Sequence, residues 1–265
     1  MKRILTILAA VALGAFALSA CGEPEPETKP IDIKDLLFSN SEIKRNQVIQ
    51  SSAMKQEMKY SVYLPPKFDE NTAYPILYLL HGAGDDQNAW LDKGDAQKIA
   101  DNYIKNQGGT PMIIIMPDAQ MTFYFMNGYE TYFQEELMST VEKKYKFNGK
   151  RAVAGLSMGG FGTLYHALKY PAKFKYAYAM SPATDVNSFK ALIDAQTDKK
   201  IFPGFTIEVG TEDTTVNNAD AEKVADYMKE QGMTCEWIAR PGIHYWNFWQ
   251  ECLPKALRKA GESFK

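Results

Sequence analysis

A serine in a glycine-rich turn is the strongest candidate for a reactive side chain. Ser157 lies in the segment Gly155-Leu156-Ser157-Met158-Gly159, between an apolar run over residues 152–156 and a helix expected over 160–170. Small residues on both sides of a serine permit the strained turn that raises its hydroxyl above a strand end. The positive N-terminus of the next helix favours a developing anion. The pattern predicts a nucleophile at Ser157, with Gly155 and Gly159 supporting the turn; the alternative is a turn without chemical function.

A second glycine-containing loop precedes the serine in the chain. The apolar run 76–80 ends in His81-Gly82-Ala83-Gly84. Attack on an ester carbonyl places negative charge on its oxygen, and fixed backbone N–H groups stabilise that charge. We expect these donors to be the N–H groups of Ala83 and Met158. For His81, which lies inside this loop, a structural hydrogen bond is favoured over a role as base, and contact with a substrate is a further possibility.

The residues that would activate the serine follow two later strands. Asp213 comes after the apolar run 205–209, and His244 comes after the run 235–239. The order Ser157, Asp213, His244 accompanies this type of nucleophile turn. We expect Nε2 of His244 to remove the Ser157 proton while Asp213 holds the other ring nitrogen. Glu212 is the nearest alternative acid, and Asp220 is a more distant one. Asp213 is favoured because aspartate is the commoner partner.

The pattern of apolar runs predicts the elements that must position these residues. Residues 58–64 alternate like a half-buried strand, whereas the later runs are short and continuous, as in strands covered on both faces. Helix-like stretches separate these runs, near residues 95–106, 129–145, 160–170, 188–196, 218–231 and 246–260. This alternation predicts an α/β fold with a mainly parallel central sheet flanked by helices and an antiparallel N-terminal edge. Such sheets carry their chemistry at the carboxyl ends of the strands.

Composition narrows the class of protein. The chain has 265 residues, a formal net charge of −2, three cysteines and three histidines. This balance disfavours nucleic acid as the main partner, and the histidines are too scattered to suggest a metal centre. No cofactor is implied. Cys235 and Cys252 are compatible either with a disulfide or with two buried thiols.

The N-terminus is typical of an export signal. Lys2-Arg3, an apolar run over residues 4–16 and small residues before Cys21 predict a signal peptide over residues 1–20. Leu18-Ser19-Ala20-Cys21 resembles a bacterial lipobox, which implies lipid on Cys21 and an exported lipoprotein at the periplasmic or outer side of a membrane. An ordinary signal peptide or an uncleaved anchor is the alternative. Residues 21–45 are interpreted as a tether and lead-in, and residues 46–265 as the catalytic domain.

The combined motifs resemble the esterase D-like branch of the α/β-hydrolases, which includes feruloyl and acetyl-xylan esterases. The resemblance covers residues 46–262 and rests on the segments 79–82, 115–118, 155–160, 210–213 and 242–246. It implies triad roles for Ser157, Asp213 and His244, and oxyanion roles for Ala83 and Met158. Ile243 departs from the pattern, because relatives often carry glycine there.

The substrate is predicted from the aromatic loop and from the expected location. Phe123, Tyr124 and Phe125 follow the strand that ends near Asp118, and aromatic faces suit sugar rings and phenolic acids. Burial under the loop is the alternative for these rings. The leading hypothesis is a serine esterase that removes feruloyl or acetyl groups from plant-type polysaccharide. A siderophore esterase, an acyltransferase and a catalytically silent binding lipoprotein are the other hypotheses.

Overall fold

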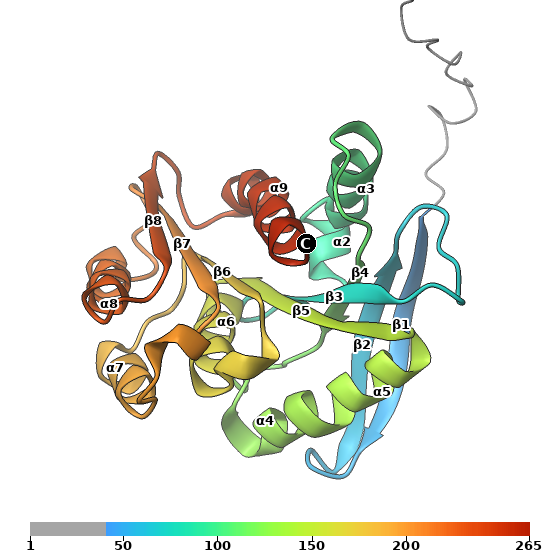
Figure 1. The fold of residues 1–265 in the computed structure, drawn as a ribbon, viewed down its shortest axis with the longest axis horizontal. Coiled ribbons are helices and arrows are strands. Elements are labelled where there is room, and N and C mark those ends of the chain that lie inside the picture. Colours follow the sequence, from blue (N-terminus) through green and yellow to red (C-terminus); the bar gives the residue numbers. More distant parts are fainter. Residues whose placement is uncertain (1–40) are drawn as a thin grey trace, which may run out of the picture. The chain divides into compact units, whose positions relative to one another are not determined.

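The computed structural model describes residues 41–265. Within this part, the chain forms an α/β domain built on one mixed sheet (Figure 1). The predictions for the signal peptide, for Cys21 and for nearly all of the tether lie outside the described residues. Among the helices that are described, none is long and apolar enough to cross a bilayer.

The sheet has eight strands in the order β1-β2-β4-β3-β5-β6-β7-β8. The strands are β1 (Glu42–Ser51), β2 (Gln56–Leu64), β3 (Tyr74–Leu80), β4 (Ile113–Pro117), β5 (Phe147–Leu156), β6 (Tyr176–Met180), β7 (Gly204–Gly210) and β8 (Cys235–Arg240). β2 pairs antiparallel with both β1 and β4, and all the other neighbours are parallel. The predicted parallel sheet with an antiparallel N-terminal edge is confirmed.

Helices cover both faces of this sheet. They are α2 (Ala89–Asp92), α3 (Ala96–Asn106), α4 (Tyr129–Thr131), α5 (Met138–Lys144), α6 (Met158–Lys169), α7 (Val186–Asp194), α8 (Asn218–Glu230) and α9 (Trp246–Ser263). Short 3₁₀ helices are η1 (Met126–Gly128), η3 (Pro171–Lys173) and η4 (Lys199–Ile201), and a π-helix, η2 (Tyr132–Leu137), joins α4 to α5. In Figure 1, α2, α3 and α9 lie on one side of the sheet and α4 to α8 on the other.

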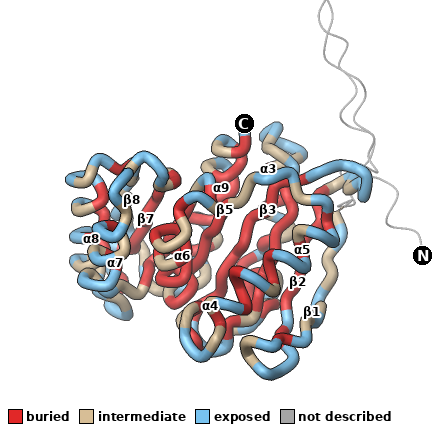
Figure 2. The backbone as a smooth tube through the Cα atoms, turned by 60° about the horizontal axis from the view of Figure 1, so that its bottom comes forward, coloured by how far each residue is buried: buried red, intermediate tan, exposed pale blue. Residues whose placement is uncertain are grey.

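Each face of the sheet has its own apolar core. Along β3, Ile76, Tyr78 and Leu80 join the core under α4 to α8, whereas Leu77 and Leu79 join the core under α3 and α9. Both sets are fully buried, which explains why this strand reads as a continuous apolar run. The central strands and α6 are accordingly the most buried parts of the backbone in Figure 2.

Three elements differ from the sequence-based expectation. β8 is expected from the sequence to be covered on both faces, but it is an edge strand and has no buried residue. β1 begins at Glu42, so the sheet starts earlier than the predicted domain boundary at residue 46. Most of its side chains are exposed or half-buried because it is an edge strand, and this polar pattern hides it in the sequence. α6 begins at Met158, directly after the serine, and so starts earlier than the helix expected from residue 160.

Parallel pairing brings the functional segments to one edge of the sheet. Leu80 pairs with Gly155 at the ends of β3 and β5, and Gly210 pairs with Arg240 at the ends of β7 and β8. The loops that follow these four strands therefore leave from the same side. They carry the glycine-containing loop after Leu80, the serine, the acid and the histidine.

Candidate active site

Ser157 occupies a strained turn between β5 and α6. Its φ and ψ are 53° and −115°, which a residue with a Cβ adopts only at an energetic cost. Its N–H donates to the Met180 carbonyl at 2.9 Å and so extends the pairing of β5 with β6. The Ser157 hydroxyl makes no hydrogen bond within residues 41–265, either to His244 or to the helix N-terminus. The strain thus serves to present a hydroxyl group without an internal partner.

Glycines on both sides of the serine make this turn possible. A Cβ on Gly155 would lie 2.5 Å from the Gly159 carbonyl oxygen, and a Cβ on Gly159 would lie 2.5 Å from the Leu80 carbonyl oxygen. Neither backbone can move away without breaking a strand or the first turn of α6. The two glycines therefore allow β5, α6 and the end of β3 to approach closely.

The loop after β3 packs against the serine. A Cβ on Gly82 would lie 3.5 Å from Cβ of Ser157 and 2.6 Å from Cδ1 of Leu156. Ala83 follows Gly82 directly, and Met158, the first residue of α6, follows the serine. The two predicted oxyanion donors thus lie in segments that meet around Ser157.

His81 is a structural part of this loop. Its side chain is only 1% exposed, and its Nε2 accepts a hydrogen bond from the Ala119 N–H at 2.9 Å. Since Nε2 is an acceptor, the neutral ring carries its proton on Nδ1, which donates to the Gly82 carbonyl at 2.7 Å. Both nitrogens are engaged within the protein, so the structure favours the structural role and argues against the predicted contact with substrate.

Asp213 and His244 form a direct hydrogen bond. Nδ1 of the imidazole lies 2.6 Å from Oδ2 of Asp213, whose side chain is fully buried. The other carboxylate oxygen accepts the N–H groups of Thr215 at 2.9 Å and Val216 at 3.3 Å. Three donors therefore fix the carboxylate and stabilise its charge. His244 is 12% exposed, so one edge of its ring reaches solvent.

Glu212, the alternative acid, binds the histidine loop in a different way. Its Oε2 accepts the Gly242 N–H at 2.7 Å, and its own N–H donates to the Gly242 carbonyl at 3.0 Å. The Glu212 side chain thus binds the backbone of Gly242, two residues before His244, and does not bind the imidazole. Of the two neighbouring carboxylates, Asp213 is the one that reaches the imidazole.

Tryptophans pack behind the histidine. The Trp249 ring meets the imidazole edge to face, with centroids 4.9 Å apart, and Trp246 packs in the same manner on Trp249 and on Trp90. Trp90 also donates its indole N–H to the Leu80 carbonyl at 3.0 Å, and this bond joins α2 to the end of β3, where the loop with His81 and Gly82 begins. No spacing in the sequence links residue 90 to segments so distant in the chain, so the role of Trp90 could not be predicted.

The aromatic loop after β4 divides into buried and accessible rings. Tyr124 is 0% exposed and donates its hydroxyl to the His81 carbonyl at 3.0 Å. Its predicted role in substrate contact is therefore wrong, because packing under the loop hides the ring. Phe123 and Phe125 are half-buried, and both pack on Phe161 of α6 with centroids 5.7 and 5.5 Å away.

His166 supports this loop from within α6. It is fully buried, its Nε2–H donates to the Tyr124 carbonyl at 2.9 Å, and its Nδ1 accepts from Gln134 at 3.0 Å. Burial lowers the pKa of His166 from 6.5 to about 3, because the charged form loses its hydration. His166 is thus a neutral structural residue that holds the aromatic loop to the helix after the serine.

Cys235 and Cys252 are free thiols in the structure. Burial raises the pKa of the Cys235 thiol to about 12, which keeps it protonated and unreactive. The described part of the chain holds no group of three or more His, Cys, Asp or Glu side chains suited to a metal ion.

Comparison with known proteins places this arrangement in a family. The family model "Putative esterase" (Esterase) matches residues 51–260. The endo-1,4-beta-xylanase/feruloyl esterase of Xylanibacter ruminicola is 31% identical over 214 residues, which cover 74% of this chain and 28% of that protein. An esterase of Mycobacterium tuberculosis is 34% identical over 146 residues, 50% of this chain and 30% of that protein. The chain thus spans less than a third of the length of these relatives.

Solved structures agree with the family model. A ferulic acid esterase superposes with a TM-score of 0.74 at 25% identity, covering 86% of this chain and 100% of the other. A ferulic acid esterase from Anaeromyces mucronatus, solved with ferulic acid, superposes with a TM-score of 0.71 at 20% identity, covering 86% and 94%. These likenesses confirm the α/β-hydrolase fold. Because the family model spans residues 51–260, which is most of the chain, this chain belongs to the esterase family of α/β-hydrolases.

Proposed function

We propose that this protein is a serine hydrolase of carboxylic esters that uses Ser157, His244 and Asp213. The observation that carries the proposal is the 2.6 Å hydrogen bond between Asp213 and His244, formed at the same sheet edge as the strained Ser157 turn. The bond fixes the tautomer that leaves Nε2 of His244 free to accept a proton. The strained serine and this base leave the sheet at the same edge, and they supply the nucleophile and the general base that nucleophilic catalysis requires.

The reaction follows from these positions. Oγ of Ser157 attacks the ester carbonyl carbon while His244 Nε2 takes its proton, and Asp213 stabilises the imidazolium. The N–H groups of Ala83 and Met158 receive the oxyanion. The protonated imidazole then gives its proton to the leaving alcohol, and a water molecule hydrolyses the acyl-enzyme by the same steps. Catalytic hydrogen bonds often tighten only when substrate is bound, so we place the Ser157–His244 bond in that complex.

Hydrolysis of p-nitrophenyl acetate tests this proposal. Ser157→Ala and His244→Ala should each lower kcat by about a millionfold, because the groups act as a unit. A fluorophosphonate probe should label the wild type and leave Ser157→Ala unlabelled. Lys55→Ala, in the exposed turn between β1 and β2, is a suitable control and should retain full activity. Equal rates for the wild type and Ser157→Ala would refute catalysis by this serine.

We propose further that the acyl group is a feruloyl or acetyl group on plant-type polysaccharide. Two observations support this: relatives named feruloyl or ferulic acid esterase, and the half-buried Phe123 and Phe125 in the loop after β4. Aromatic rings stack favourably on a phenolic acid. Initial rates on methyl ferulate, acetylated xylan and p-nitrophenyl acetate test the assignment. If the wild type hydrolyses p-nitrophenyl acetate but hydrolyses neither methyl ferulate nor acetylated xylan faster than Ser157→Ala does, the assignment is contradicted.

We also propose that the protein is exported and anchored by lipid at Cys21. The support comes from the basic start, the apolar run and the Leu18-Ser19-Ala20-Cys21 segment. Multiple acyl chains give stable membrane attachment. The full-length chain expressed in a bacterial host should incorporate labelled palmitate and sediment with membranes, and Cys21→Ala should abolish the labelling. Labelling of Cys21→Ala equal to that of the wild type would disprove lipidation at this residue.

A further inference from the structure

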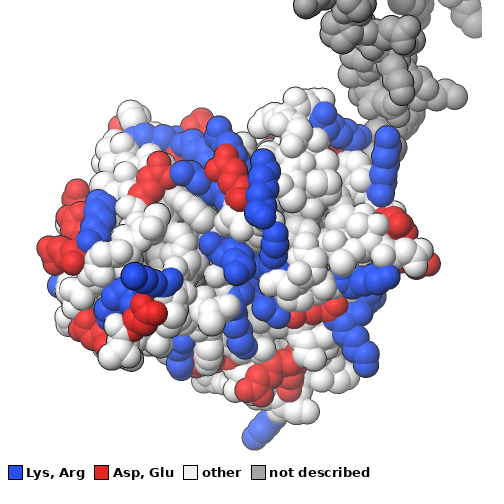
Figure 3. Space-filling model, viewed as in Figure 1, with Lys and Arg blue, Asp and Glu red and all other residues white. Residues whose placement is uncertain are grey.

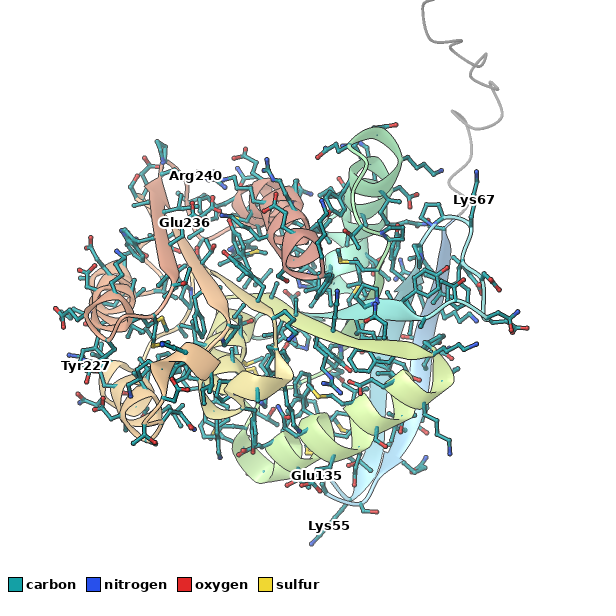
Figure 4. The ribbon with its side chains drawn as sticks, viewed as in Figure 1. Lys55, Lys67, Glu135, Tyr227, Glu236 and Arg240 are labelled. Atoms are coloured by element: carbon teal, nitrogen blue, oxygen red, sulfur yellow. The ribbon has the colours of Figure 1, made fainter. Side chains whose placement is uncertain are left out.

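We infer that Arg240 is a positioning residue for His244, holding both ends of the histidine loop against the strand that leads to Asp213. The inference rests on the proposed function of His244. Arg240 is the last residue of β8, and the loop over residues 241–245 connects it to α9 (Figure 4). One guanidinium group is thus placed where it can bind both the neighbouring strand β7 and the helix α9 that follows the loop.

The Arg240 side chain binds partners on both sides of the loop. Its Nε donates to Oε1 of Glu208 on β7 at 2.5 Å, and its Nη2 donates to the Phe248 carbonyl in α9 at 3.0 Å. Its Nη1 donates to Oε2 of Glu251, also in α9, at 2.7 Å. The guanidinium carbon lies 3.9 Å from the centre of the Phe248 ring. The planar fork therefore joins β7, β8 and the first turns of α9.

Glu208 is the buried partner that holds the Arg240 guanidinium against β7. Positive and negative side chains are interspersed on the surface in Figure 3, and exposed ion pairs contribute little to stability. Glu208 differs, because its side chain is fully buried and also accepts hydrogen bonds from Lys255 and from the Tyr178 hydroxyl. Burial alone would raise the pKa of Glu208, but these donors outweigh it and lower the pKa, so the carboxylate is charged.

The connection reaches the histidine through Phe248 and Gly242. A Cβ on Gly242 would lie 2.3 Å from Cδ2 of Phe248, so the ring packs directly on the loop backbone. On the other side, the Arg240 carbonyl accepts the Thr211 N–H at 2.8 Å, two residues before Asp213. Contacts of Arg240 thus hold both the loop that carries Asp213 and the loop that carries His244. Displacing a base by about 1 Å is enough to lower a rate by about a hundredfold.

A lysine at this position separates the effect of charge from that of geometry. Arg240→Lys keeps the positive charge beside Glu208 but loses the fork that also binds Phe248 and Glu251. Arg151→Lys is a matched control, because Arg151 makes a forked pair with Glu142 and is 20% exposed, against 21% for Arg240. Arg151 lies on β5 before the buried run that ends at the serine, away from the histidine loop.

The first measurement is kcat and KM on p-nitrophenyl acetate, with melting temperatures recorded for both variants. Arg240→Lys should lower kcat by about ten- to a hundredfold with KM nearly unchanged. Arg151→Lys should change kcat by less than about twofold, as expected for a pair that only affects stability. Equal kcat values for the two variants, at comparable melting temperatures, would overturn the inference.

A second measurement does not depend on turnover. The His244 Nδ1 proton in the short bond to Asp213 should give a far-downfield proton resonance, assigned by its loss in His244→Gln. Arg240→Lys should shift or broaden this signal, and Arg151→Lys should leave it in place. If the wild type hydrolyses no ester but the signal responds in this way, the proposed function fails and the positioning role stands. An unaltered signal in Arg240→Lys would refute the positioning role. If Arg240→Lys does not fold, Glu208→Gln takes its place in both measurements.

Discussion

Glu212 binds the backbone of Gly242 through two reciprocal hydrogen bonds, at 2.7 and 3.0 Å. The next residue, Asp213, binds the imidazole of His244 at 2.6 Å. Two consecutive acidic residues on one loop therefore hold the backbone and the side chain of the following loop. Because the Glu212 side chain makes an exposed contact with a backbone group, whereas the fully buried Asp213 side chain binds the imidazole itself, the two carboxylates should differ sharply in their effect on activity.

Exchange of each carboxylate for its amide should separate these roles. Asp213→Asn should lower kcat by about four orders of magnitude, because an amide favours the wrong imidazole tautomer. Glu212→Gln retains an acceptor for the Gly242 N–H, so kcat should fall by less than about fivefold. Kinetics on p-nitrophenyl acetate compare the two variants. A large loss for Glu212→Gln with an active Asp213→Asn would reverse the assignment of the acid.

Replacement of Trp249 tests the packing behind the base. The indole nitrogen of Trp249 is buried and has no hydrogen-bond partner among the described residues. Trp249→Phe removes that donor and keeps a ring against His244, so it should cost less than about 1.5 kcal/mol. Trp249→Ala leaves a cavity and should cost about 3–5 kcal/mol. Denaturant unfolding measures both values, and equal losses would show that the ring is not the stabilising feature.

His166 should make the stability of the domain depend on pH. Its pKa is lowered from 6.5 to about 3 in the folded state, so below about pH 6.5 the unfolded chain binds a proton that the folded chain does not. The stability contributed by the neutral ring is complete above that pH and is lost as the pH falls toward 3, at up to about 1.4 kcal/mol per unit.

Urea unfolding at pH 7 and pH 5 measures this effect. The wild type should lose about 2 kcal/mol more between these pH values than His166→Gln, whose side chain does not titrate. The comparison between the variants removes the contribution of other titrating groups that the two proteins share. The same pH dependence in both proteins would mean that His166 is not buried as a neutral ring.

Gly159→Ala tests how closely the serine turn approaches the end of β3 and the loop that follows it. A methyl group there would lie 2.5 and 2.6 Å from the carbonyl oxygens of Leu80 and His81, which are backbone atoms. Alanine favours a helix by about 1 kcal/mol over glycine, but the clash should outweigh this gain and destabilise the protein by about 1–3 kcal/mol. We expect kcat to fall as well. A variant that is more stable and equally active would contradict this geometry.

The sequence by itself determined the parts of this protein that local patterns specify. Continuous apolar runs predicted β3 to β7, because strands buried on both faces have no polar side to reveal. The run over residues 235–239 also predicted β8, but this strand is an edge of the sheet and none of its residues is buried. Glycines around Ser157 predicted the strained turn, since only small residues fit between crossing backbones. The chain order of Ser157, Asp213 and His244 predicted that these residues follow strands ending at one edge of the sheet and that Asp213 pairs with His244, which the 2.6 Å hydrogen bond between them shows.

Only the tertiary structure decided which residues from distant segments of the chain are in contact. β1 is a polar edge strand whose pairing with β2 gives no clear local signal. The burial of Tyr124, the choice of Asp213 over Glu212 and the connection from Glu208 through Arg240 all depend on contacts across the sheet. A local sequence pattern indicates whether a side chain is exposed or buried. Which residue that side chain contacts depends on packing between elements that are far apart in the chain.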